Sequence, residues 1–154
     1  MTVDMRSYLQ QIKKTNDVFT VRKKVSTKYE IASVTEKLDG SRAALFENVQ
    51  GSKFKLVSNM IGTRDRFAQA IGAKKSDINK KIVKAISSAK KPKISKTAKF
   101  FENSSNDISI LPIVTHFQNE SGPFITSSIL YTRNQEKKSQ NSSIHRLMPI
   151  GKNH

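Results

Sequence analysis

The chain has 154 residues, of which 36% are hydrophobic and 26% charged, and none is cysteine. This length allows one domain with a real core, while the missing cysteines exclude a disulfide framework and a thiolate metal site. Lys and Arg number 28 against 12 Asp and Glu, and the net charge of +16 favours polyanionic partners such as nucleic acid, anionic lipid or phosphorylated ligands without choosing among them.

The N-terminus has no apolar stretch of the kind found in signal peptides, and the longest purely apolar run is short. The sequence therefore predicts no signal peptide and no membrane span. A cytoplasmic protein is the simplest interpretation.

The first part of the chain alternates between helical and extended patterns. Apolar residues recur at helical spacing in four segments, and short apolar or alternating runs separate them. The predicted helices span residues 4–14, 26–40, 62–72 and 76–88. The predicted strands span residues 17–25, 42–49 and 54–60.

The second predicted helix contains a pattern that could be mistaken for a catalytic motif. Lys37 begins K-x-D-G-x-R, the pattern that supplies the AMP-accepting lysine of ATP-dependent DNA and RNA ligases. A nucleotidyltransferase needs that lysine desolvated beside a nucleotide pocket. Here Ser26 or Thr27 is a candidate N-cap and Gly40 a candidate helix end, so Lys37 falls in the last turn, where the helix dipole stabilises a cation. We therefore interpret Lys37 as a helix-end residue.

Residues 74–99 form a lysine-rich segment with a single acid, Asp77, and no interleaved aromatic residue. Point charges without aromatic stacking groups give only nonspecific attraction to nucleic acid. The composition favours a solvated helix and connector over a nucleic-acid patch. The lysines are Lys74, Lys75, Lys80, Lys81, Lys84, Lys90, Lys91, Lys93, Lys96 and Lys99.

The pattern changes after the connector. Three β-rich stretches, at residues 109–117, 122–134 and 142–151, are separated by polar loops. The sequence thus predicts an α/β part up to about residue 108 and the start of an antiparallel β part after it.

Motifs in both halves resemble one family. "LPIVTHFQNESGPFITSSILYTRN" followed by "NSSIHRLMPIGKN" holds a leucine-proline strand, then G-P-F-I-T, then N-x-S-I-x-R. Earlier, "ALFENVQG" precedes a strand and N-x-x-G-T-x-x-R. In this order, over nearly the whole chain, they resemble the UbiD family of prenylated-FMN-dependent decarboxylases. The lysine-rich segment matches least.

This resemblance implies an α+β fold. The family has an α/β N-terminal domain, a split β-barrel of flavin-reductase type that holds the cofactor, and a C-terminal domain used in oligomerisation. Residues 1–108 would form the first domain, with 74–99 as its lysine-rich helix and connector, and residues 109–154 would begin the barrel. Because family members run to several hundred residues, we interpret the chain as the N-terminal portion of a homo-oligomeric protein.

The resemblance also assigns site residues within "NSSIHR". Asn141 would be the metal ligand, a hard oxygen donor suited to manganese, with potassium as a further candidate ion. Ser143, Ile144 and His145 would line the prenylated FMN, largely through backbone groups. Arg146 would be the catalytic residue and would also contact the cofactor, because its fork lies between two later carboxylates over the reacting edge of the flavin.

Each of these residues has a simpler alternative. Asn141 could cap a turn, His145 without partner ligands is no metal site, and Arg146 could be a surface residue of a barrel strand. The joint spacing N-x-S-I-x-R after G-P-F-I-T favours the functional interpretation.

The implied activity is that of a carboxy-lyase that removes CO2 from an α,β-unsaturated or aromatic acid, with the cofactor supplying the chemistry. The segments "KLDG" and "SIHR" resemble archaeal members of the family, which favours trans-anhydromevalonate 5-phosphate of archaeal isoprenoid synthesis as the substrate. The segment "IGKN" also matches the bacterial branch, so polyprenyl-4-hydroxybenzoate of ubiquinone synthesis is the alternative. In relatives the other metal ligands and the proton donor lie beyond residue 154, so the 154-residue chain is predicted to be inactive alone.

A non-catalytic basic nucleic-acid-binding or scaffold protein is the alternative of another class. Its binding to DNA would depend steeply on salt. The decarboxylase interpretation predicts a small carboxylic acid as partner and no nucleic acid.

Overall fold

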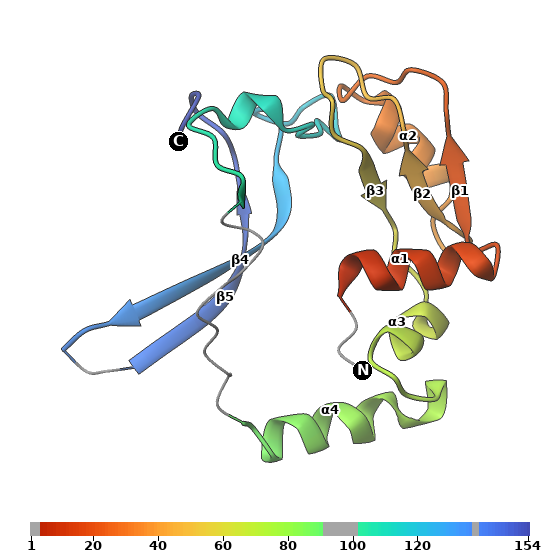
Figure 1. The fold of residues 1–154 in the computed structure, drawn as a ribbon, viewed down its shortest axis with the longest axis vertical. Coiled ribbons are helices and arrows are strands. Elements are labelled where there is room, and N and C mark those ends of the chain that lie inside the picture. The colour runs from red at the N-terminus through yellow and green to blue at the C-terminus, as the bar shows by residue number, and fades with distance from the viewer. Residues whose placement is uncertain (1–3, 91–101, 137–138) are drawn as a thin grey trace. The chain divides into compact units, whose positions relative to one another are not determined.

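The computed structural model describes residues 4–90, 102–136 and 139–154 (Figure 1). Within them the fold is a mixture of helices and small sheets, which confirms the predicted α+β class. The helices are α1 (Met5–Lys14), α2 (Glu30–Lys37), α3 (Arg64–Ala70) and α4 (Ile78–Ser87), with 3-10 turns η1 (Lys75–Asp77) and η3 (Ile108–Ile110). The strands are β1 (Val18–Val21), β2 (Ala43–Phe46), β3 (Leu56–Ser58), β4 (Ile125–Asn134) and β5 (Ser139–Leu147).

Two compact units share this chain, and each takes segments from both halves of the sequence. The first unit comprises Met1–Val21, Thr35–Phe46 and Val57–Ser105. The second comprises Arg22–Val34, Glu47–Leu56 and Asn106–His154. The predicted domain boundary between residues 108 and 109 stays a prediction.

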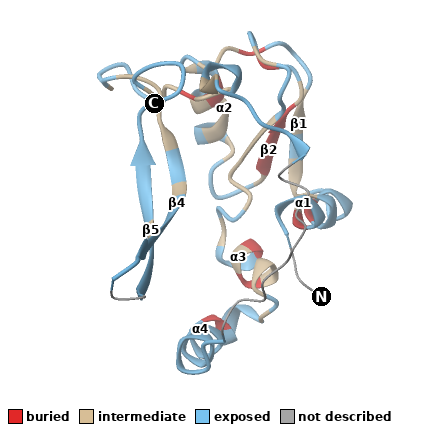
Figure 2. Ribbon diagram, turned by 60° about the vertical axis from the view of Figure 1, so that its left-hand side comes forward, coloured by how far each residue is buried: buried red, intermediate tan, exposed pale blue. Residues whose placement is uncertain are grey.

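A three-stranded sheet in the order β1-β2-β3 organises the N-terminal elements, with β2 at its centre (Figure 1). Strands β1 and β2 are parallel, with Val18 opposite Ala43 and Val21 opposite Phe46. All four residues of β2 are buried (Figure 2). This explains why "AALF" is a continuous apolar run: a central strand covered on both faces has no solvent-facing position.

Helix α1 contributes its apolar face to the core of the first unit. Asp4 caps the helix by accepting hydrogen bonds from the backbone N–H groups of Arg6 and Ser7. Tyr8 and Ile12, one turn apart, are 3% and 0% exposed. They form one cluster with Ala43 of β2, against which Leu9, Val18, Met60 and Ala70 are packed.

Helix α2 begins later than predicted. Neither Ser26 nor Thr27 caps it, because the Ser26 hydroxyl accepts the Lys28 N–H and the Ser26 N–H donates to a carboxylate oxygen of Glu30, which together form a separate turn. Tyr29 then adopts a left-handed backbone conformation (φ 70°) immediately before the helix. The other end was predicted correctly: Lys37 lies exposed in the last turn of α2.

The basic segment contains the predicted helix, as α4. Ile78 is buried, whereas Lys80, Lys81 and Lys84 are exposed, in agreement with a solvated lysine face. Lys75 pairs with Asp65 at 2.9 Å. The last four lysines of the segment, Lys91, Lys93, Lys96 and Lys99, lie outside the described residues.

The second unit is built from isolated bridges and one long ribbon. Val25 pairs with Val49 and Lys28 with Thr115, both in parallel, while Val114 pairs with Phe124 in antiparallel fashion. From Phe124 the chain continues into β4, which pairs with β5 as an antiparallel two-stranded ribbon. Most side chains of this ribbon are exposed (Figure 2). Closure of these strands into a split barrel stays a prediction.

None of the helices formed by the described residues is both long and apolar enough to cross a membrane.

Candidate functional site

All five predicted site residues lie on β5. The register places Asn141 opposite Thr132, and Ser143 opposite Leu130. Ile144 lies opposite Ile129, and His145 lies opposite Ser128. Arg146 follows near the end of the strand, beside the irregularity in β4 between Ile125 and Ser128.

Strand alternation divides the five residues between two faces of the ribbon. Asn141, Ser143 and His145 share one face, and Ile144 and Arg146 share the other. At about 3.3 Å per residue, Asn141 and Arg146 are separated by roughly 17 Å along the strand. The two residues therefore lie too far apart, and on opposite faces, to contact the same atom of a ligand.

The face that carries Asn141 includes a contact between two of the predicted site residues. His145 Nε2 lies 2.9 Å from Ser143 Oγ, so the histidine is oriented by a neighbouring hydroxyl. Asn141 itself is exposed, which leaves its amide oxygen open to solvent.

Arg146 contacts an aromatic ring. Its guanidinium carbon lies 4.5 Å from the centroid of the Phe124 ring, a cation–π contact. Ile144, on the same face, is 76% exposed, and its cross-strand partner Ile129 is 59% exposed. This face thus combines an open apolar pair with a fixed cation.

A tight turn before β4 holds an acid near this arginine. One carboxylate oxygen of Glu120 accepts the backbone N–H groups of His116, at 2.9 Å, and Phe117, at 3.2 Å. These hydrogen bonds, that of His116 foremost, hold the pKa of Glu120 below its usual value, and the charge of Arg146 adds to the effect. Glu120 is therefore a carboxylate, not a proton donor, near neutral pH.

The described residues do not form a complete metal centre. No group of three or more His, Cys, Asp or Glu side chains comes together in this part of the chain in a way that could hold an ion. Asn141 supplies one oxygen donor of the hard type that manganese accepts. A metal at Asn141 would need further ligands.

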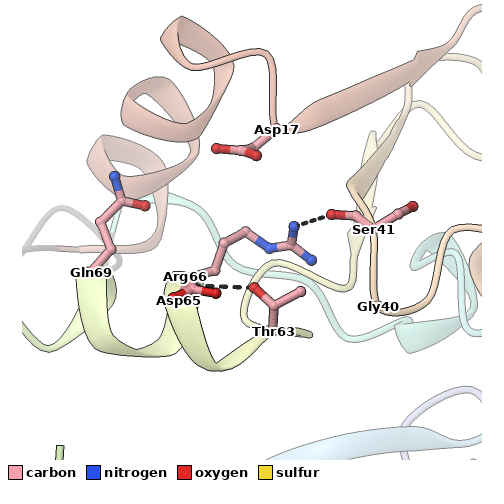
Figure 3. Close-up of a pocket in the computed structure, with 7 residues that line it drawn as sticks. All are labelled: Asp17, Gly40, Ser41, Thr63, Asp65, Arg66 and Gln69. Carbon is pink, nitrogen blue, oxygen red and sulfur yellow. Dashed lines mark hydrogen bonds between the residues drawn. The ribbon is translucent and has the colours of Figure 1, made fainter. Parts of the chain in front are cut away.

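A separate polar hollow of about 560 Å³ lies in the first unit (Figure 3). Arg66, only 4% exposed, crosses it and donates from Nη1 to the Ser41 carbonyl at 2.5 Å and from Nη2 to the Asn59 carbonyl at 3.2 Å. The backbone carbonyl of Arg66 accepts the Tyr8 hydroxyl at 2.7 Å. The other lining residues are Asp17, Gly40, Thr63, Asp65 and Gln69. Both terminal nitrogens of the guanidinium donate to backbone oxygens, while its buried Nε has no partner among the described residues, so this arrangement ties three segments together.

The sequence alone does not indicate the surroundings of either arginine. In the sequence, Phe124 stands out only as part of G-P-F-I-T, and Glu120 only as part of a polar loop. Arg66 stands out only as the last residue of N-x-x-G-T-x-x-R. The spacing of His116 and Glu120 is a usable signal for the turn, because an acid four residues on can accept the N–H groups of the turn that precedes it.

Family models match the whole of the chain beyond its first eight residues. Residues 9–86 match the 3-octaprenyl-4-hydroxybenzoate carboxy-lyase N-terminal domain. Residues 87–154 match the Rift-related domain of the same carboxy-lyase.

Two curated relatives are archaeal proteins named anhydromevalonate phosphate decarboxylase. The one from Methanosarcina mazei is 32% identical over 96% of this chain and 34% of its own length. The one from Methanothermobacter thermautotrophicus is 28% identical over the same shares. The chain therefore spans about a third of the length of the curated relatives it matches. These relatives do not favour a nucleic-acid-binding or scaffold protein.

Solved structures agree with the sequence relatives. The UbiD-class enzyme HmfF from Pelotomaculum thermopropionicum, solved in complex with FMN, matches with a TM-score of 0.90 and 30% identity over 96% of this chain and 34% of that chain. An evolved dimeric form of HmfF in complex with prFMN matches with a TM-score of 0.85 and 28% identity, over 96% of this chain and 36% of that chain. The motifs, the family models and the relatives thus agree, and this chain belongs to the UbiD family of carboxy-lyases.

Proposed function

We propose that this chain serves in a UbiD-type decarboxylase that removes CO2 from trans-anhydromevalonate 5-phosphate. The observation that carries the proposal is the 32% identity to the Methanosarcina mazei anhydromevalonate phosphate decarboxylase over 96% of the chain. A phosphorylated substrate also suits a chain of net charge +16. Polyprenyl-4-hydroxybenzoate is the alternative substrate, since the matched family domains are named for its octaprenyl form.

The cofactor we propose is prenylated FMN, which would accept the electron pair left on the substrate carbon when CO2 departs. One face of the β4–β5 ribbon fits a flat, partly apolar group. Ile144 and Ile129 present an open apolar pair there, and Arg146 lies on the same face with donors that can orient a substrate carboxylate. Ser143 and His145 would contact the cofactor from the strand's other face, largely through backbone groups.

Asn141 would hold the divalent ion at the phosphate end of the cofactor. Its exposed amide is a suitable donor for manganese, or for potassium as a second candidate. Asn141 and Arg146 would then act at positions roughly 17 Å apart along β5 and on opposite faces of the strand.

Three further parts of the proposal concern the whole protein. Residues 109–154 would begin a split β-barrel that follows an α/β domain in residues 1–108. The working enzyme would be a cytoplasmic homo-oligomer. The 154-residue chain alone would not turn over substrate, because it spans only about a third of the length of its curated relatives.

A chimera tests the proposal most simply. The matching third of the Methanosarcina mazei decarboxylase would be replaced by this chain, and the purified protein would be supplied with prenylated FMN and manganese. We expect CO2 release from trans-anhydromevalonate 5-phosphate and none from a polyprenyl-4-hydroxybenzoate. The unmodified archaeal enzyme is the positive control, and the 154-residue chain alone should be inactive.

The outcomes show which acid is the substrate and whether this chain can serve in a decarboxylase. CO2 release from the hydroxybenzoate, and not from the phosphate, would make polyprenyl-4-hydroxybenzoate the substrate. A folded chimera that binds the flavin but decarboxylates neither acid would refute the decarboxylase function for this chain.

A further inference from the structure

We propose that Phe124 is a positioning residue for Arg146, one that holds the guanidinium on the Ile144 face of the ribbon. The inference rests on the proposed function only in what it says of the reaction, because the contact itself is independent of any ligand. The contact is the 4.5 Å separation between the guanidinium carbon and the centroid of the Phe124 ring. A planar guanidinium on an aromatic face keeps its N–H donors at the edge, where they can still reach a carboxylate.

The backbone of Phe124 is fixed although its neighbourhood is a loop. The Phe124 N–H donates to the Val114 carbonyl at 3.1 Å, and Val114 is 7% exposed. Thr115, the next residue, donates its N–H to the Thr27 carbonyl at 3.0 Å. The ring therefore starts from a strand position that is anchored to a buried residue and to a second segment of the same unit.

Hydrogen bonds of Glu120 stabilise the turn between Thr115 and Phe124. Glu120 accepts two backbone N–H groups with one carboxylate oxygen, and its own N–H donates to the Phe117 carbonyl at 3.2 Å. The charge of Arg146 also helps to lower the pKa of Glu120, so this carboxylate and the guanidinium attract each other.

The role predicted for Arg146 requires such support. An arginine on an exposed strand has many side-chain conformations, and a catalytic group loses rate steeply when it is misplaced by an ångström. Arg133 on β4 is a natural comparison, since it is an exposed arginine of the same ribbon with no aromatic contact among the described residues. Phe124 distinguishes Arg146 from Arg133.

Two substitutions distinguish the effect of the aromatic ring on Arg146 from the effect of side-chain volume alone. Phe124→Leu keeps an apolar side chain but removes the ring, and Phe124→Tyr keeps the ring. In the 154-residue chain, NMR should show the Cδ protons of Arg146 shifted upfield of those of Arg133 by the ring current. The shift should persist in Phe124→Tyr and be lost in Phe124→Leu. Unchanged methyl signals of Val49, which is 3% exposed in the same unit and pairs with Val25, would show that both variants fold.

The chimera adds the functional measurement. Phe124→Leu should lower kcat by about 10- to 100-fold with little change in KM, as expected for a misplaced catalytic group. Phe124→Tyr should keep the kcat of the wild-type chimera. A missing upfield shift in the wild-type chain, or a shift that survives in Phe124→Leu, would overturn the proposal. If the shift behaves as expected while the wild-type chimera is inactive, the proposed function fails and the positioning contact stands.

Discussion

Two arginines in two regions of this protein show how differently the same side chain can be used. Arg66 in the first unit is 4% exposed, and its fork is taken up by the carbonyl oxygens of Ser41 and Asn59. Arg146 on the ribbon is exposed and rests on the ring of Phe124, which leaves its donors open. The first arrangement holds the fold together, whereas the second presents a charge to a ligand. Substitutions should therefore affect stability in the first region and function in the second.

The largest difference is expected between core and ribbon truncations. Phe46 is 0% exposed at the centre of the sheet, so Phe46→Ala should lower the free energy of unfolding by about 3–5 kcal/mol. Ile144→Ala, on the open face of β5, should change it by less than about 0.5 kcal/mol. Denaturant titrations of both variants would measure this. Equal losses would show that the ribbon face is packed in solution.

The next effect tests Arg66 as a structural tie. Arg66→Met keeps the apolar stem but removes the donor of the Ser41 carbonyl and one of the two donors of the Asn59 carbonyl, which keeps the Gly62 N–H, and it should cost about 1–3 kcal/mol of unfolding free energy. Arg64→Met, at an exposed position in the same helix, is the matched control and should stay within about 0.5 kcal/mol of the wild type. If the two variants were equally stable, Arg66 would not hold these segments.

A smaller effect is expected at the other end of this network. Tyr8→Phe removes the hydrogen bond to the Arg66 carbonyl and should cost roughly 1 kcal/mol. Burial raises the pKa of Tyr8 above its ordinary value of 10.0. The stability linked to neutral Tyr8 is thus present below pH 10 and lost as pH rises through the raised pKa. Between pH 8 and 11 the melting temperature of Tyr8→Phe should fall less steeply than that of the wild type. Identical slopes would show that ionisation of Tyr8 does not cause the loss of stability.

The smallest effect concerns the cap of α1. The backbone N–H groups of Ser7 and Arg6 lower the pKa of Asp4 below 3.8. The stability that the carboxylate contributes is therefore present above about pH 4 and lost as pH falls through the lowered pKa. Asp4→Asn keeps a capping oxygen that does not titrate. Its melting temperature should drop less than that of the wild type between pH 5 and pH 2, and parallel curves would contradict this assignment.

The elements of the first unit could be predicted because local patterns specified them. Apolar residues at helical spacing predicted α1, and a short apolar run that includes "AALF" predicted the strand β2. The start of α2 could not be predicted, since the Ser26 hydroxyl was taken by a turn that depends on Lys28 and Glu30. Hydroxyl residues favour caps and turns by the same chemistry, so the sequence alone does not choose between them.

The candidate site was predictable in position but not in arrangement. The spacing N-x-S-I-x-R placed Asn141 and Arg146 on one strand, and strand alternation puts them on opposite faces. The support of Arg146 was not predictable, because Phe124 precedes it by 22 positions and only the pairing of β4 with β5 brings the two together. The burial of Arg66 was not predictable either, because a charged residue in a short helix is usually exposed.

One measurement tests the central claim most directly. In the chimera with the Methanosarcina mazei enzyme, Arg146→Lys keeps the charge but loses the planar fork and its stack on Phe124. Decarboxylation of trans-anhydromevalonate 5-phosphate should fall by about 10²- to 10³-fold, while the melting temperature stays that of the parent because Arg146 is exposed. Full activity of Arg146→Lys, or a loss that follows a loss of folding, would contradict a catalytic role for the ribbon.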